Sequence, residues 1–174
     1  MRAVLANLLI CFALLFVTAG NASGHVVVAN TRSATISNKF PLEALDPKGK
    51  IFGVAQVVDG RVTLGAGRQI PRDLDFVVTQ EGQLVLGRKH TTLANGQDVL
   101  AAGRLKLTGE GQVRLINNLS GHYRPTVSEA SAYPALFEKL GVNVSGARLQ
   151  LWDILDNGGY VTTPPKPAVD WIIQ

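Results

Sequence analysis

The sequence contains one cysteine, few aromatic residues and no long hydrophobic run after its opening segment. Cys11 lies inside that opening segment, so the remaining chain has no disulfide and must be stabilised by a hydrophobic core. Aromatic residues make up 6% of the chain, too few for a platform that stacks single-stranded nucleic acid. The motifs of zinc proteases, zinc ribbons, P-loop nucleotide-binding proteins and α/β-hydrolases are also missing, so these classes have no support.

Residues 1–24 have the order of a secretory signal peptide. Arg2 supplies the positive charge, residues 8–17 are apolar, and small and polar residues follow. The apolar run is shorter than the roughly 18 to 20 residues that span a bilayer. We therefore expect cleavage after Ala22 or Gly24 and a secreted or periplasmic protein.

The remaining residues, 25–174, are enough for one hydrophobic core in a single domain. No second apolar stretch is long enough to cross a membrane. The formal charge of +4 falls by one when Arg2 is removed, and the basic residues are scattered along the chain. A nucleic acid or another acidic partner is therefore possible but not required. The sequence indicates no cofactor and does not give the oligomeric state.

Two stretches have the pattern of β-hairpins. In residues 76–86 (FVVTQEGQLVL) and 104–116 (RLKLTGEGQVRLI), a Glu-Gly pair separates two runs of residues that favour strands. In the second stretch apolar residues alternate with polar ones. This two-residue period is typical of a sheet with one face exposed to solvent. We expect an antiparallel meander.

One helix is predicted after these strands. Thr126 and Glu129 have the spacing of a capping box, and the residues that follow have helical periodicity. Pro134 lies inside this pattern, which predicts either a kink or a regular helix that begins near Ala132. Gly141 predicts the end of the helix.

Together these patterns predict an α+β domain, mainly an antiparallel β-sheet or a partly closed barrel, with one covering helix. Residues 162–174 form a proline-rich tail with an apolar end. That end either docks on the domain or binds something else, and docking is favoured because exposed apolar clusters are rare in monomers.

Five residues could take part in catalysis. His90 follows a predicted strand directly after Lys89, and His122 is followed by Tyr123 and Arg124. Two imidazoles and a nearby cation are the groups needed for metal-independent cleavage of a phosphodiester, as general base, general acid and charge stabiliser. The alternative is that each histidine caps a turn by bonding to the backbone.

His25 could bind a metal. If cleavage follows Gly24, the terminal amine and imidazole of His25 can chelate copper together. If it follows Ala22, the terminal amine, backbone nitrogens and the same imidazole can hold Cu(II) or Ni(II). A histidine at the start of a strand also needs no function, so metal binding stays an alternative.

The stretch KHTTLANGQDVLAAGRLKLTGEGQVRLINNLSGHYRPT, followed by a helix and LGVNVSGARLQL, resembles a known module. The module occurs in C-terminal regions of bacterial secreted and toxin-like proteins and in plant calmodulin-binding IQ-motif proteins. The resemblance covers roughly residues 76–151 and implies a β-rich fold but no particular reaction. This chain has neither an IQ motif nor a large toxin body upstream, so calcium signalling and toxin delivery are not expected. The matching residues are His90, Thr91, Gly103, Gly121, His122, Tyr123 and Pro125.

These observations favour a secreted bacterial effector-type or binding module. It would act on a macromolecular partner through the face that carries His90 and the SGHYRP corner, residues 120–125. The alternatives are a small metal-independent nuclease that uses the histidine pair, and a periplasmic copper-binding protein that uses His25.

Overall fold

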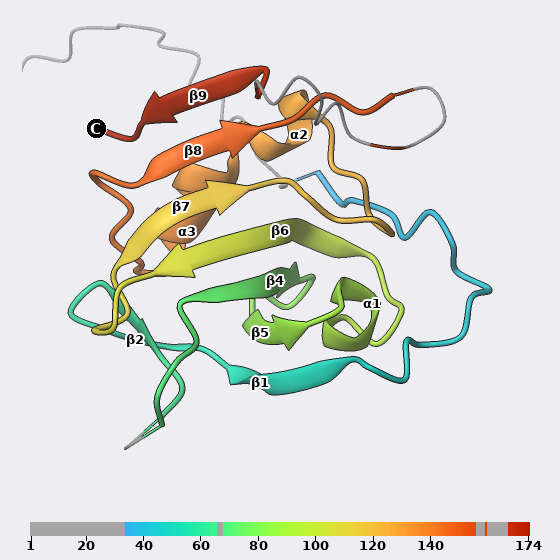
Figure 1. Ribbon diagram of the computed structural model, residues 1–174, viewed down its shortest axis with the longest axis horizontal. Helices are drawn as coiled ribbons and strands as arrows, with labels where there is room; N and C mark the ends of the chain where they lie inside the picture. The colour runs from blue at the N-terminus through green and yellow to red at the C-terminus, as the bar shows by residue number, and fades with distance from the viewer. Residues whose placement is uncertain (1–33, 66–67, 156–158, 160–166) are drawn as a thin grey trace, which may run out of the picture. The chain divides into compact units, whose positions relative to one another are not determined.

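The protein is built on an open seven-stranded sheet, seen in Figure 1. The computed structural model describes residues 34–65, 68–155, 159 and 167–174, which belong to the compact unit Arg32–Gln174. The strand order is β1-β5-β4-β6-β7-β8-β9, and β2 and β3 form a separate hairpin. In chain order the elements are β1 (Lys50–Val54), β2 (Gln56–Val58), β3 (Arg61–Thr63), β4 (Asp73–Thr79), β5 (Leu84–Arg88), α1 (His90–Leu93), β6 (Val99–Leu107), β7 (Val113–Asn117), α2 (Val127–Ala130), α3 (Tyr133–Lys139), β8 (Arg148–Leu151) and β9 (Val169–Ile172).

Both predicted hairpins are present. Strands β4 and β5 pair with Phe76 opposite Leu86, and β6 and β7 pair with Leu105 opposite Ile116. The order in the sheet differs from a meander, because the chain passes from β5 through α1 to β6, which pairs with the other side of β4. Strand β8 then lies parallel to β7. This parallel pairing is possible because α2 and α3 lie in the connection between the two strands.

The predicted capping box is present at the start of α2. Thr126 Oγ1 accepts a hydrogen bond from the Glu129 backbone N–H at 3.1 Å, and the Glu129 carboxylate accepts one from the Thr126 N–H at 2.7 Å. The helix is divided, because a second segment, α3, begins at Tyr133 with Pro134 in its first turn. A proline is tolerated there, where its missing N–H would have no partner within the helix. The start of α3 confirms the prediction of a regular helix from near Ala132.

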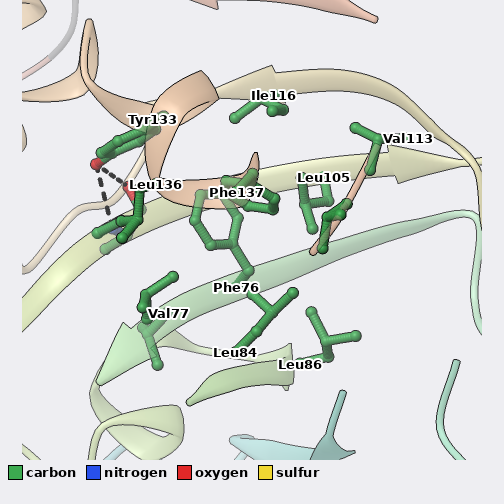
Figure 2. Packing of buried hydrophobic residues seen from close by; sticks show 14 of the residues in the cluster. Phe76, Val77, Leu84, Leu86, Leu105, Val113, Ile116, Tyr133, Leu136 and Phe137 are labelled. Carbon is green, nitrogen blue, oxygen red and sulfur yellow. Dashed lines mark hydrogen bonds between the residues drawn. The ribbon is translucent and has the colours of Figure 1, made fainter. Parts of the chain in front are cut away.

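The core lies between α3 and one face of the sheet, as Figure 2 shows. The ring of Phe76 on β4 meets Tyr133 edge-on at 5.9 Å and Phe137 edge-on at 5.2 Å between centroids. The Tyr133 hydroxyl donates to the Ala102 carbonyl at 3.0 Å and accepts from the Ala102 N–H at 3.2 Å. Burial of one phenylalanine ring contributes about 1.5 to 3 kcal/mol, so these contacts fix α3 on the sheet.

The opposite face of the sheet is polar over part of its area. Side chains alternate between the two faces of a strand, so Asp75 and Arg104, which lie opposite each other, point away from α3. Helix α1 covers one end of this face, because a Cβ placed at Gly87 would lie 2.8 Å from Leu93 Cδ2. At the other end, β6, β7 and β8 carry charged and amide side chains around a small hollow.

These elements confirm the α+β prediction. The described sheet is open, with β1 and β9 at its edges, so the strands do not close into a barrel. The end of the tail is docked through β9, in which Trp171 is half exposed, and the next residue after the strand, Ile173, is buried. Residues 162–166 of the tail and the predicted signal peptide, 1–24, lie outside the described residues. Within the described part of the chain, no helix has the length and apolar character needed to span a bilayer.

Candidate functional site

His90, the first residue of α1, lies in the interior. Its side chain is buried, and its Nε2 bonds to the backbone carbonyl of Gly103 on β6 at 2.8 Å. Because a carbonyl only accepts, this contact places the proton on Nε2 of a neutral ring. Burial lowers the pKa of His90, although the negative charge of Asp75 and the bond to Gly103 oppose the shift. A neutral imidazole therefore joins α1 to the centre of the sheet.

Gly103 permits this contact because it has no side chain. A Cβ at this position would overlap the carbonyl oxygen of Asn117 on β7 and would lie 3.1 Å from an atom of the Phe76 ring. Close approach of two backbones is a common reason for a glycine within a strand. The bond from His90 to Gly103 and the close approach of Gly103 to Asn117 therefore bring α1, β6 and β7 together.

Asn117 then directs the chain out of β7. Its Oδ1 accepts hydrogen bonds from the backbone N–H groups of Arg104 at 3.0 Å and Leu119 at 3.1 Å. At the end of β7, the side-chain amide of Asn117 thus takes the place of a backbone carbonyl as the acceptor for the Arg104 N–H on β6. The local turn follows from the tendency of asparagine to bond to the backbone two residues ahead.

Asn118 connects the SGHYRP corner to the residue that follows β8. Its fully buried side chain donates to the Pro125 carbonyl at 2.8 Å and to the Trp152 carbonyl at 2.9 Å. It also accepts from the Trp152 N–H at 2.9 Å. One side chain therefore holds both ends of the corner in place against the neighbouring strand.

Tyr123 is buried under the corner. Its ring has no exposed area, and its hydroxyl donates to the backbone carbonyl of Gln97. Burial raises the pKa of Tyr123 to about 12, and the negative charge of Asp98 adds to this effect. The hydroxyl is thus neutral at ordinary pH and serves as an anchor between the corner and the loop before β6.

His122 and Arg124 lie on the outside of the same corner. His122 Nε2 is 3.0 Å from a carboxylate oxygen of Glu43, and its ring meets Phe40 edge-on at 5.7 Å between centroids. The Arg124 guanidinium lies 4.6 Å from the centroid of Phe40, within the range of a cation–π contact. Leu42, between these two partners in sequence, is 99% exposed. We call these five residues, Phe40, Leu42, Glu43, His122 and Arg124, the corner surface.

Lys89 stands beside His90 but points elsewhere. Its ammonium group is 2.9 Å from the Asp46 carboxylate, and its backbone N–H donates to Asp75 Oδ2 at 2.8 Å. The hydrogen bond that the Lys89 ammonium donates to Asp46 raises the pKa of Lys89. Lys89 therefore holds the loop before β1 and positions a carboxylate near His90.

The structure brings the two histidines into one region but into different surroundings. Burial is the main cause of the lowered pKa of His90, and the proximity of His122 adds to it. One of them is buried with Nε2 bonded to a carbonyl, whereas the other is partly exposed on the corner surface.

The sequence analysis missed two partners of these histidines. The sequence pattern did not distinguish Asp75 from other carboxylates near strand ends, and nothing marked Glu43 as a neighbour of a residue 79 positions away. Only the alternation of β4 could have indicated Asp75, because it lies on the face opposite Phe76.

His25, the predicted metal ligand, lies outside the described residues. Among residues 34–65, 68–155, 159 and 167–174, no three histidine, cysteine or acidic side chains are grouped to hold a metal ion. Comparison with known proteins adds no assignment: no protein-family model, curated protein or solved structure matches this chain.

Proposed function

We propose that this chain is an exported bacterial effector-type or binding module that holds a macromolecular partner on the corner surface. The signal-like order of residues 1–24 supports export, and the SGHYRP pattern supports a relation to modules of secreted bacterial proteins. The proposal places binding on the outer side of the corner, because the inner side is used for packing. The partner that fits this surface best is a protein.

The observation that carries the proposal is the backbone of Arg124. Its φ is 45°, in the left-handed region that favours glycine. An arginine there costs roughly 1 kcal/mol or more, and strain of this kind is concentrated at functional sites. The strained backbone holds the guanidinium over the ring of Phe40, and Leu42, two residues after Phe40 in the chain, is exposed.

The composition of the corner surface supports a protein partner. Arginine and aromatic residues are enriched at protein–protein interfaces and supply most of their hot spots. The remaining N–H groups of Arg124 can bind a carboxylate or carbonyl, and Leu42 offers an apolar side chain for a pocket on the partner. Glu43 and His122 are already paired with each other at 3.0 Å, so they fit the polar rim of such an interface.

The nuclease alternative receives less support. A histidine that abstracts a proton from a ribose hydroxyl must come within hydrogen-bond reach of it. The Nε2 of His90 is bonded to Gly103 inside the protein, which leaves His122 as the accessible imidazole of the pair. The copper alternative depends on His25, and mass spectrometry of the mature N-terminus would show whether that residue is exposed by cleavage.

Site-specific photocross-linking tests the proposal. A benzoyl-phenylalanine is placed at Leu42, or at the exposed Glu138 on α3 as the control, in cells that make the protein. We expect one cross-linked adduct of defined mass from position 42 and none of that mass from position 138. Equal adducts from both positions, or no adduct from position 42, would contradict binding at the corner surface.

A second measurement separates binding from catalysis. Residues 25–174 are expressed in a bacterial cytoplasm, beside a His122→Ala variant of equal solubility, and cellular RNA is examined. Intact RNA in both cultures is the expected result. RNA breakdown that disappears in the variant would instead establish the nuclease alternative.

A further inference from the structure

The polar face of the sheet contains a hollow that lies apart from the corner surface. Its volume is about 180 Å³, and it lies where β4, β6, β7 and β8 run side by side. The charged lining residues are Asp73, Arg104 and Lys106. The other lining residues are Leu115, Asn117, Leu119, Gln150 and Trp152.

Two cations and one carboxylate line this hollow. Asp73 is bonded to Arg104 Nη2 at 2.8 Å, and Arg104 Nε is 3.8 Å from Asp75. Lys106 is exposed and has no ion-pair partner within the described part of the chain. The three lining charges therefore leave an excess of one positive charge, carried by Lys106.

The wall of the hollow also contains a polar group without a partner. The indole N–H of Trp152 is shielded from water and has no hydrogen-bond acceptor among the described residues. A buried donor of this kind carries its full cost of desolvation. Trp152 is also one of the residues that line the hollow, so binding there requires a turn of its ring that brings the N–H to the bound acceptor.

We propose that this hollow binds a carboxylate group of a peptide, either an acidic side chain or a C-terminus. Lys106 supplies the neutralising charge, Arg104 supplies free N–H donors, and Trp152 supplies the indole donor. A carboxylate is favoured over phosphate because it carries one negative charge, which matches the single excess positive charge. A phosphate dianion would exceed this single positive charge and leave a negative charge beside Asp73.

This proposal is independent of the corner surface, because none of its lining residues belongs to that surface. Failure of binding in the hollow would leave a partner at Leu42 possible, and the reverse also holds. A negative result in the cross-linking experiment at position 42 therefore leaves the binding experiment on the hollow unaffected, and a negative result on the hollow leaves the cross-linking experiment unaffected.

Nuclear magnetic resonance of the protein tests the proposal directly. The chain has two tryptophans, so its spectrum contains two indole N–H signals, which a Trp171→Phe variant assigns. The probes are acetyl-Gly-Glu-Gly-amide, its neutral match acetyl-Gly-Gln-Gly-amide, acetyl-Gly-Gly-Gly with a free C-terminus, and inorganic phosphate. We expect a saturable downfield shift of the Trp152 signal with at least one of the two carboxylate peptides, and an unchanged Trp171 signal.

Two lysine variants complete the test. Lys106→Gln should weaken binding of the carboxylate peptide at least tenfold, whereas Lys139→Gln, an exposed lysine on α3, should leave it unchanged. The relative affinities of the Glu peptide and the free C-terminus identify which source of carboxylate is preferred. An equal response to the Gln peptide, tighter binding of phosphate, or no shift of the Trp152 signal would overturn the proposal.

Discussion

The Nε2 of His90 lies 2.8 Å from the carbonyl oxygen of Gly103, and this bond connects the first turn of α1 to the central strand β6. The bond is buried, and no other side chain of α1 reaches that carbonyl. The histidine of the motif is thus part of the structure that positions the corner. The contribution of His90 can therefore be measured as a change in the free energy of unfolding.

His90→Ala should lower the free energy of unfolding by about 2 to 4 kcal/mol. The substitution leaves a cavity and removes the partner of a buried carbonyl. His122→Ala is the matched control and should cost at most about 1 kcal/mol, because the contact with Glu43 that it breaks is partly exposed. Urea unfolding of the two variants measures both values, and equal losses would show that His90 has no special structural role.

Stability should also fall in acid because of His90. Burial lowers the pKa of His90 in the folded protein below its ordinary value of 6.5. The unfolded chain therefore takes up a proton first as the pH falls. The contribution of His90 to the free energy of unfolding is fully present above pH 6.5. It is lost as the pH falls toward the lowered pKa of His90 in the folded state.

Urea unfolding of the wild type and of His90→Gln at pH 7.5 and 5.0 measures this loss. Asp75, Arg104 and His122 surround the ring in both proteins, so their own contributions largely cancel in the difference. We expect a smaller loss of stability in the variant. The same loss in both proteins would mean that His90 is already solvated in the folded state.

Gly103→Ala should be one of the most damaging small substitutions in the chain. The added methyl group would overlap the carbonyl oxygen of Asn117, so β6 and β7 would have to separate. Overpacking of this kind costs about 1 to 3 kcal/mol and more where backbone must move. Gly121→Ala is the control, since a Cβ there has open space. Thermal unfolding should show a large drop for position 103 and a change within about 0.5 kcal/mol for position 121.

Tyr123→Phe removes the hydroxyl that bonds to Gln97. The loss should be about 1 to 1.5 kcal/mol near neutral pH. Because burial raises the pKa of Tyr123 to about 12, the hydroxyl stabilises the folded state below pH 10, and this contribution is lost between pH 10 and 12. The difference in stability between wild type and variant should therefore shrink across that range. A constant difference would show that the hydroxyl titrates equally in both states.

Local patterns were sufficient for much of the fold. The Glu-Gly turns predicted two hairpins, and Thr126 with Glu129 predicted the start of α2, because each depends on residues close in sequence. The order of β4, β5 and β6 was not predictable in this way, since it depends on which edge of β4 is free when β6 forms.

The sequence offered candidate residues for a site but did not indicate how they are arranged. The sequence pointed to His90, His122, Tyr123 and Arg124 as neighbours of one corner. It did not indicate that His90 and Tyr123 face inward, because this depends on contacts with Gly103 and Gln97 from another strand and loop. The hollow beside Trp152 was missed for the same reason, as its lining comes from four strands and the loops next to them.

The most direct test of the account is the effect of Arg124→Gly on the cross-link at position 42 and on unfolding. Glycine relaxes the left-handed backbone, and this gain of roughly 1 kcal/mol offsets the lost contact with Phe40. We predict that the adduct disappears while the free energy of unfolding stays within about 0.5 kcal/mol of the wild-type value. An adduct that persists at wild-type yield in the stable variant would contradict binding through Arg124.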